Sequence, residues 1–171
     1  MQGSNTVASL HFYMEQLNLP ECELRLCKND EDNTISVYDI LRQKFVALTP
    51  EEWVRQHFVH FLIDEKKYPQ SFMANEVAIR LNGTSRRCDT VVYDRHCKPL
   101  MIIEYKATDV NITQAVFDQI VRYNMVLKVK YLVVSNGKNH YICQIDYDTK
   151  KYAFLKDIPQ YSSLYYPATN I

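Results

Sequence analysis

The 171-residue sequence has no long hydrophobic run, and no stretch of it approaches the roughly 20 consecutive apolar residues of a membrane span. Its N-terminal residues also lack the basic segment and apolar core of a secretory signal. We therefore expect a cytoplasmic protein without a membrane segment. The length suits one domain over 1–171, with a core of about 17–161, an extension of 1–16 and a tail of 162–171.

Motifs that bind zinc or nucleotides are missing as well. The sequence contains no CxxC pair and no P-loop pattern, and its histidines have no spacing that suggests a zinc site. We expect the scattered cysteines to be reduced thiols that serve mainly in packing. These cysteines are Cys22, Cys27, Cys88, Cys97 and Cys143.

The chain has no excess of charge of either sign, because 20 Lys and Arg residues balance 20 Asp and Glu residues. The overall balance therefore gives no support to nucleic-acid binding. The local distribution is uneven, since basic residues gather around Asp89 and Asp94, namely Arg80, Arg86, Arg87, Arg95 and Lys98. Such a group is either a solvated charged loop or a patch that faces phosphates, and both interpretations stay open.

Two segments carry helix signals. In residues 50–66, Thr49 can act as N-cap, Pro50 stands at the first helical position, and Glu51 and Glu52 fall in the first turn. Residues 112–127 place apolar side chains at helical spacing. These apolar side chains are Ile112, Val116, Ile120, Tyr123 and Leu127. An apolar stretch from Val7 to Leu17 is also compatible with a helix.

Strand patterns fill most of the remaining chain. Residues 22–40 alternate in polarity around a polar turn and predict a hairpin. Further strands are predicted over 74–81, 86–94, 100–106, 130–134, within 138–148 and within 151–171. Because a helix lies between the strands at 100–106 and 130–134, their connection should be a parallel crossover. The predicted fold is α/β (α+β), with a mixed central β-sheet flanked by helices on both faces.

A group of charged residues follows a core-like strand. Leu100 to Ile103 form an apolar run that leads into Glu104 and Lys106, which share a strand face, whereas Tyr105 points to the other face. If this strand pairs antiparallel with the preceding one, Asp89 and Glu104 come near one another at the same end. Two close carboxylates repel unless a divalent cation holds both. The alternative is a structural ion pair at the end of a core strand.

The helix that follows adds a second polar feature. Gln119 and Tyr123 are one turn apart beside its apolar stripe, in the pattern QxxxY. Asp followed by Glu-x-Lys is the pattern of the PD-(D/E)xK nucleases, and QxxxY accompanies it in several of them. A satisfied polar group at the edge of a buried stripe is the other interpretation of Gln119.

With these motifs the chain resembles the N-terminal nuclease domain of the restriction (R) subunit of type I restriction enzymes, over about Leu17 to Tyr161. The resemblance is carried by "LNLP", "TPEEWVRQH", "RRCDTVVYD", "KPLMIIEYKA", "ITQAVFDQIVRYN", "YLVVSNG" and "IPQY". It implies a restriction-endonuclease-like PD-(D/E)xK fold and magnesium-dependent DNA cleavage, with Asp89, Glu104 and Lys106 in the catalytic roles. It also implies that Gln119 and Tyr123 support the site or contact the DNA.

Further site residues follow from the same resemblance. Nucleases of this superfamily often add a Glu from the first helix to the metal site, and Glu51 is a better candidate than Glu52 because it lies on the face of Val54 and Phe58. Alternatively, both are first-turn residues that the helix dipole favours. Glu76 on the strand before the hairpin is another candidate ligand. Arg86 and Arg87 are expected to hold DNA phosphates.

Two hypotheses of different class remain. In the first, the chain is an enzyme, in which Asp89, Glu104 and the backbone carbonyl of Tyr105 bind Mg²⁺ or Mn²⁺ and Lys106 positions the attacking water. In the second, it is a module that docks on DNA or on a protein without cutting, because no translocase motor accompanies the domain in this sequence. Methylase, specificity or translocase subunits are the expected partners. Tyr105 departs from the family pattern, which often has a small residue or Cys at that position.

Overall fold

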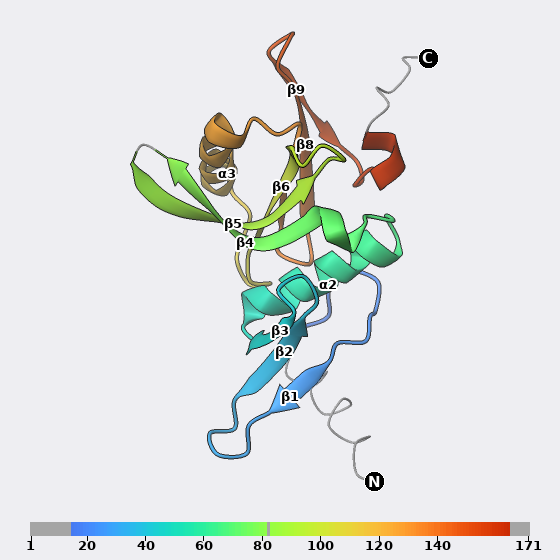
Figure 1. The fold of residues 1–171 in the computed structure, drawn as a ribbon, viewed down its shortest axis with the longest axis vertical. Coiled ribbons are helices and arrows are strands. Elements are labelled where there is room, and N and C mark those ends of the chain that lie inside the picture. The colour runs from blue at the N-terminus through green and yellow to red at the C-terminus, as the bar shows by residue number, and fades with distance from the viewer. Residues whose placement is uncertain (1–14, 82, 165–171) are drawn as a thin grey trace.

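The computed structural model describes residues 15–81 and 83–164 of the chain, which form a mixed α and β fold with two sheets (Figure 1). The smaller sheet is antiparallel and consists of β1 (Leu26–Lys28), β2 (Ile35–Asp39) and β3 (Lys44–Ala47). The predicted hairpin within 22–40 is thus confirmed by β1 and β2. The third strand was not predicted, and these strands form a sheet of their own, separate from the central one.

A buried carboxylate fixes the turn between β2 and β3. Asp39 is fully buried, and its Oδ1 accepts hydrogen bonds from the backbone N–H groups of Leu41 and Arg42 at 2.8 and 2.9 Å. Its Oδ2 accepts one from Asn75 of the central sheet at 2.8 Å, and the Arg42 side chain also pairs with it. Asp39 therefore attaches the small sheet to the central sheet through polar contacts.

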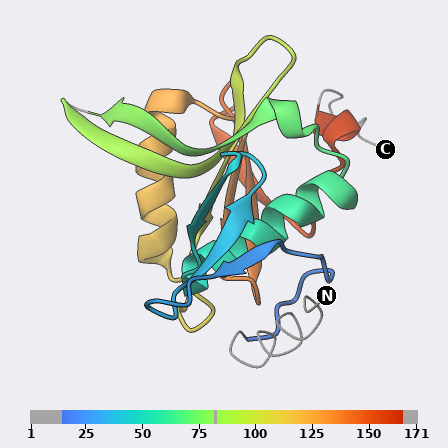
Figure 2. The same cartoon turned by 60° about the horizontal axis from the view of Figure 1, so that its bottom comes forward.

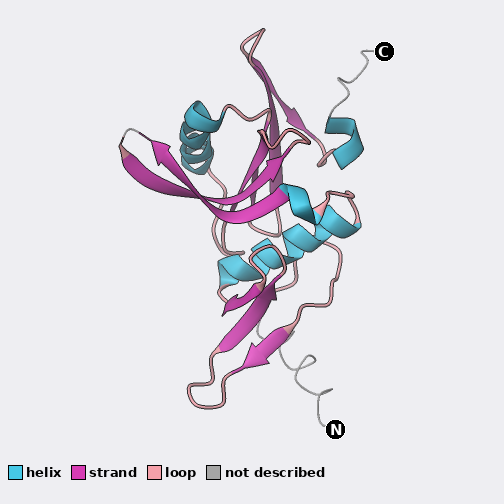
Figure 3. Ribbon diagram, viewed as in Figure 1, coloured by secondary structure: helices cyan, strands magenta, loops and turns pink. Residues whose placement is uncertain are grey.

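The central sheet has six strands in the order of the sequence. They are β4 (Met73–Leu81), β5 (Thr84–Tyr93), β6 (Pro99–Tyr105), β7 (Tyr131–Ser135), β8 (His140–Asp146) and β9 (Lys151–Leu155). All neighbours are antiparallel except β6 and β7, which are parallel. The predicted mixed sheet and its parallel crossover are thus confirmed (Figure 3).

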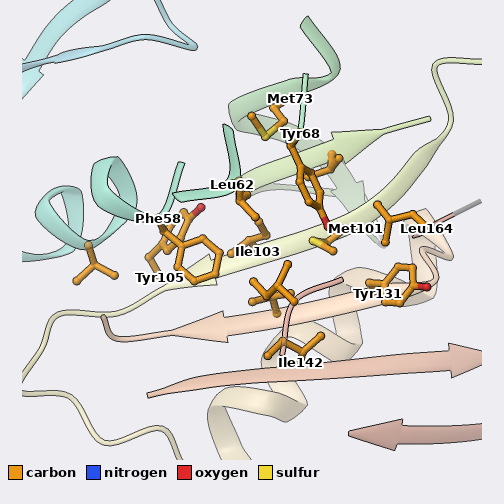
Figure 4. Packing of buried hydrophobic residues seen from close by; sticks show 14 residues of the cluster. Phe58, Leu62, Tyr68, Met73, Met101, Ile103, Tyr105, Tyr131, Ile142 and Leu164 are labelled. Atoms are coloured by element: carbon orange, nitrogen blue, oxygen red, sulfur yellow. The ribbon is translucent and has the colours of Figure 1, made fainter. Parts of the chain in front are cut away.

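Helix α2 (Pro50–Asp64) begins as the sequence predicts, because the Thr49 hydroxyl accepts a hydrogen bond from the Glu52 N–H at 3.1 Å. It ends two residues before the predicted end. Its buried residues Val54, Phe58 and Leu62 pack in one cluster with side chains from the sheet (Figure 4). The sheet residues of this cluster include Met101, Ile103, Tyr105, Tyr131 and Val133.

Helix α3 (Gln114–Leu127) begins two residues later than predicted, because Thr113 has extended backbone angles (φ −102°, ψ 170°). It ends at Leu127, because the next residue, Lys128, has a left-handed conformation (φ 49°) that terminates the helix. Phe117 and Ile120 of α3 pack in a second cluster. The sheet residues of that cluster include Cys88, Val91, Ile102, Leu132 and Val134.

Successive side chains of β6 point alternately into the two clusters. Ile103 and Tyr105 pack with α2, whereas Ile102 packs with α3. The side chain of Glu104 therefore leaves the strand on the side of Ile102, and that of Tyr105 on the side of α2. This alternation lets β6 carry the charged Glu104 next to its last residue although it is a core strand.

Two expectations for the chain termini are only partly tested. Most of the stretch from Val7 to Leu17 lies outside the described residues, and residues 15–17 are not helical. After β9 the described chain ends in the 3₁₀ helix η2 (Tyr161–Leu164). Among the residues that the structure describes, no helix has the length and apolar character needed to cross a membrane.

Candidate active site

The pairing of β5 with β6 brings the predicted acidic residues to one end of the two strands. Thr90 pairs with Ile103, so Asp89 and Glu104 are the next residues beyond that pair. Asp89 Oδ2 accepts a hydrogen bond from the backbone N–H of Tyr105 at 2.8 Å. This bond ties the Asp89 carboxylate to the end of β6, between Glu104 and Lys106.

The strands are irregular at this position. Cys88 and Val91 lie in the same cluster although they are three residues apart, which a regularly alternating strand does not allow. Across the hairpin, Glu76 has a left-handed backbone (φ 58°), and the pairing passes from Asn75–Thr90 to Val77–Cys88. Side chains therefore do not alternate regularly between the two faces through Asp89. Such irregularities redirect a side chain from the face that alternation would give it.

A buried arginine from α2 joins the acidic residues. Arg55 is 5% exposed, and its Nη2 lies 2.9 Å from Asp89 Oδ1 while its Nη1 lies 2.6 Å from Glu76 Oε1. The same Nη1 is 3.2 Å from Glu52 Oε2. The sequence reasoning missed this residue. The sequence carried no clear signal for it, because the polar residues Gln56 and His57 follow Arg55 in "WVRQHF" and predict a solvated helix face.

Glu104 has an unusual environment for a carboxylate. Its side chain is buried, Lys106 Nζ lies 3.4 Å from its Oε1, and its Oε2 accepts no hydrogen bond from the described residues. Burial and then the nearby charge of Asp89 raise the pKa of Glu104 to about 7. Burial also raises the pKa of Asp89, although Arg55 and the Tyr105 N–H act in the opposite direction. Arg55 and Lys106 therefore do not fully offset the burial and mutual repulsion of the two carboxylates, and a cation would supply further positive charge.

The two further candidate ligands lie near this pair but differ in their contacts. Burial and the charge of Asp89 raise the pKa of Glu51, so its carboxyl group lies within electrostatic range of the pair. Glu76 is held by Arg55 and Arg87, which lower its pKa although burial acts in the opposite direction. Glu52 is buried and bonded to Arg42 and Gln56, in addition to Arg55. Of the two first-turn carboxylates, Glu51 is therefore the more available metal ligand, because Glu52 already bonds to other side chains.

The remaining predicted residues lie on α3 and on the β4–β5 hairpin. Gln119 and Tyr123 belong to α3, but their side chains lie outside what the structure describes. Arg86 and Arg87 are exposed on β5, and Arg87 Nη1 lies 3.3 Å from Glu76 Oε2. Arg87 is thus connected through Glu76 and Arg55 to Asp89.

The donor set at this site fits a hard divalent cation. Asp89 and Glu104 supply carboxylate oxygens at adjacent strand ends, one of which is a buried oxygen without a hydrogen bond. Mg²⁺ in proteins takes one or two carboxylates and completes its shell with other oxygen ligands. Within 15–81 and 83–164, no three or more His, Cys, Asp or Glu side chains come together as a complete ligand set. The described residues thus offer the Asp89 and Glu104 carboxylates at the end of β6, with Glu51 nearby.

Comparisons with known proteins find a matching family and similar solved structures. The model of a family described as the type I restriction enzyme R protein N terminus matches residues 50–159, which is well over half of the chain. Among solved structures, a fragment described as an HsdR subunit of a type I restriction enzyme from Vibrio vulnificus YJ016 is similar, with 24% identity and a TM-score of 0.37. That similarity covers 54% of this chain and 18% of the other. No curated protein sequence matches.

Proposed function

The chain belongs to the family of the type I restriction enzyme R protein N terminus, and on this premise we propose that it is a metal-dependent DNA endonuclease domain. The proposed reaction is hydrolysis of phosphodiester bonds. The observation that carries it is the buried Glu104 carboxylate, which has one oxygen without a hydrogen bond and lies next to Asp89 at the end of β6. A stable protein rarely leaves such a group uncompensated unless a ligand uses it.

The proposed fold is that of the PD-(D/E)xK nucleases, with helices on both faces of the central sheet. The mixed sheet with its parallel β6–β7 pair supports it, as does the packing of α2 and α3 with different residues of β6. In this fold Asp89 takes the place of the first acidic residue. Glu104 and Lys106 then form the Glu-x-Lys pair.

The proposed metal ligands are Asp89, Glu104 and the backbone carbonyl of Tyr105. Bound Mg²⁺ or Mn²⁺ supplies Lewis-acid chemistry, since it activates water near neutral pH and offsets charge on the phosphate. Lys106 orients the attacking water and offsets the negative charge that develops on the phosphate oxygens. Its position 3.4 Å from Glu104 Oε1 supports this role.

Other residues hold or extend this proposed site. Glu51 adds a further oxygen ligand, directly or through water, whereas Glu76 remains paired with Arg55. Gln119 and Tyr123 on α3 orient the metal shell or contact the DNA. Arg86 and Arg87 hold phosphates, as their exposure permits.

The family suggests the setting of this activity. We propose that the domain acts within a type I restriction complex in the cytoplasm, together with DNA and with methylase, specificity or translocase subunits. Mg²⁺ or Mn²⁺ is the proposed cofactor. These partners would supply DNA translocation and sequence recognition.

One observation favours a second function, a DNA- or protein-binding module that does not cut. Both oxygens of Asp89 already accept hydrogen bonds, from Arg55 at 2.9 Å and from the Tyr105 N–H at 2.8 Å. An Asp89 carboxylate that serves only Arg55 is a structural group. The two functions differ in whether Asp89 also takes part in metal binding.

Incubation of the purified chain with single-stranded, duplex and branched DNA, in Mg²⁺ or Mn²⁺, tests the proposal. We expect cleavage of at least one DNA form that EDTA and Asp89→Ala both abolish. Gln144→Ala is a matched control, because this residue lies in β8, away from the site. DNA binding without cleavage in any metal would contradict the enzyme and support the binding module.

A further inference from the structure

The β4–β5 hairpin extends beyond the rest of the central sheet beside α3 (Figures 1 and 2). Its strands pair from Val77–Cys88 to Leu81–Thr84. Residues that pair directly lie on the same face, so one face carries Ala78, Arg80, Ser85 and Arg87. We call these four residues the open face of the hairpin. All four are exposed.

The other face of the hairpin is occupied by packing. Ile79 and Cys88 belong to the cluster that contains Phe117 and Ile120 of α3, and Val77 packs against it. Arg86 pairs with Ile79 and so lies on this α3 side. An approaching ligand therefore meets Arg80 and Arg87 first, and these two arginines are separated by small side chains that let a flat or curved surface come close.

The hairpin is positively charged along its whole length. Residues 77–88 include three arginines and no acidic residue. Neither Arg80 nor Arg86 forms an ion pair with a residue that the structure describes, and the Arg87 side chain is 67% exposed. Arg87 has Glu76 as a partner, at 3.3 Å, and Glu76 is also bound by Arg55. Most of this positive charge is thus available to an anionic ligand.

The open face continues into the candidate active site. Arg87 contacts Glu76, Glu76 contacts Arg55, and Arg55 contacts Asp89, all through ion pairs of 3.3 Å or less. Arg87 is two residues from Asp89 along β5, roughly 7 Å in an extended strand, and Ser85 with its partner Arg80 is twice as far. Positive charges roughly 7 Å apart along the hairpin match every second phosphate of one DNA strand, because each strand has one phosphate per ~3.4 Å of helix axis.

The kind of nucleic acid follows from what the hairpin offers. Proteins that bind single strands combine basic grooves with exposed aromatic rings on which bases stack. Residues 77–88 contain no aromatic residue, and the exposed rings of Tyr152 and Phe154 lie on β9, at the other edge of the sheet. The open face thus has groups for phosphate contact and none for base stacking.

We propose that the open face of the β4–β5 hairpin binds the backbone of duplex DNA and guides it to Asp89. This inference rests on the proposed DNA-directed function and adds the surface that holds the DNA. Arg80 and Arg87 each hold a phosphate, and Ala78 and Ser85 allow the backbone to approach. The resulting contacts are independent of sequence, as expected for phosphate contacts.

Binding of the full chain to a fluorescent 24-base-pair duplex and to one of its single strands, in EDTA and over a series of salt concentrations, tests the proposal. We expect Arg80→Gln with Arg87→Gln to weaken duplex binding at least tenfold and to reduce the salt slope by about 2, since each lost phosphate contact contributes ~0.9. Single-strand binding should change less than twofold. Lys150→Gln with Lys151→Gln, an exposed basic pair at the far edge of the sheet, is the matched control.

Three outcomes would overturn the proposal. These are an unchanged duplex affinity in the arginine variant, an equal loss for single strands and duplex, and an equal loss in the lysine control. A loss of single-strand binding in Tyr152→Ser with Phe154→Ser would assign single strands to β9 and leave the hairpin assignment intact. Cleavage is measured separately. Duplex binding that depends on the hairpin arginines, without cleavage, contradicts only the proposed nuclease. Cleavage by the parent chain together with an unchanged duplex affinity in the arginine variant contradicts only this inference.

Discussion

Arg55 Nη2 lies 2.9 Å from Asp89 Oδ1, so a buried arginine of α2 holds a carboxylate that β5 supplies. The other Asp89 oxygen accepts the Tyr105 N–H from β6. One carboxylate therefore joins a helix and two strands at the point where the chain places its candidate catalytic residues. Arg55 orients Asp89 and reduces the repulsion among Asp89, Glu76 and Glu52, since it contacts all three.

Loss of this arginine should destabilise the protein strongly. Arg55→Met leaves buried carboxylates without their cation, and removal of one partner of a buried ion pair typically costs about 3–5 kcal/mol. Arg87→Met is the matched control, because Arg87 also pairs with Glu76 but is largely exposed, and an exposed pair contributes about 1 kcal/mol or less. Urea unfolding of both variants gives the two free energies. Equal losses would contradict a special role of Arg55.

Metal binding should depend on Asp89 and Glu104 together. Asp89→Asn and Glu104→Gln each keep the shape of the side chain and remove a charge that a divalent cation needs. Calorimetric titration with Mg²⁺ or Mn²⁺ should detect binding to the parent chain and no binding, or affinity lower by at least tenfold, in either variant. Asp94→Asn, in the exposed turn before β6, should bind as the parent does. Metal affinity that persists in both site variants would place the cation elsewhere.

The sequence predicted the central strands with their parallel crossover, both helices, and the position of Asp89 and Glu104 at the same end of paired strands. These features depend on local signals: Thr49 and Pro50 start α2, and the apolar run from Leu100 to Ile103 marks a core strand. It did not predict the contacts of Arg55, because no local pattern shows that a helical arginine will face a strand end 34 residues later in the chain. The left-handed backbone of Glu76 could not be predicted either, because a non-glycine residue adopts this conformation only when tertiary contacts support it.

Stability should fall with rising pH because of Glu104. Its pKa is raised from the ordinary 4.5 to about 7 in the folded protein. The folded state therefore binds a proton that the unfolded state has already released, and stability declines as the pH rises between these values. The contribution is fully present below pH 4.5 and is lost above about 7. Denaturant unfolding of the metal-free chain across this range measures the decline.

Glu104→Gln isolates this effect from other titrating groups. The amide does not ionise, so the variant should lose less stability than the parent between pH 4.5 and 7. His140, whose pKa burial lowers, titrates equally in both proteins and cancels in the difference. If the free energies of unfolding of parent and variant decline in parallel, the pKa of Glu104 is not raised in the folded protein. Its carboxylate would then have no need of a cation.

Lys106 should contribute to the chemical step more than to DNA affinity. Its ammonium lies 3.4 Å from Glu104 Oε1, at the end of β6, where it can offset charge that grows only as the phosphate is attacked. Loss of one such electrostatic group typically lowers the rate by ~10²–10³. Lys106→Met should therefore reduce single-turnover cleavage by this factor and leave the dissociation constant for DNA within about threefold.

Lys98→Met, in the exposed turn before β6, is the control, because it removes the same charge outside the strand end. It should cut at the parental rate. If Lys106→Met cleaves DNA as the parent does, the Glu104–Lys106 contact is a structural ion pair that closes a core strand. If it loses binding and cleavage by the same factor, Lys106 is a phosphate contact like those of the hairpin, and charge stabilisation in the transition state belongs to the metal and its ligands alone.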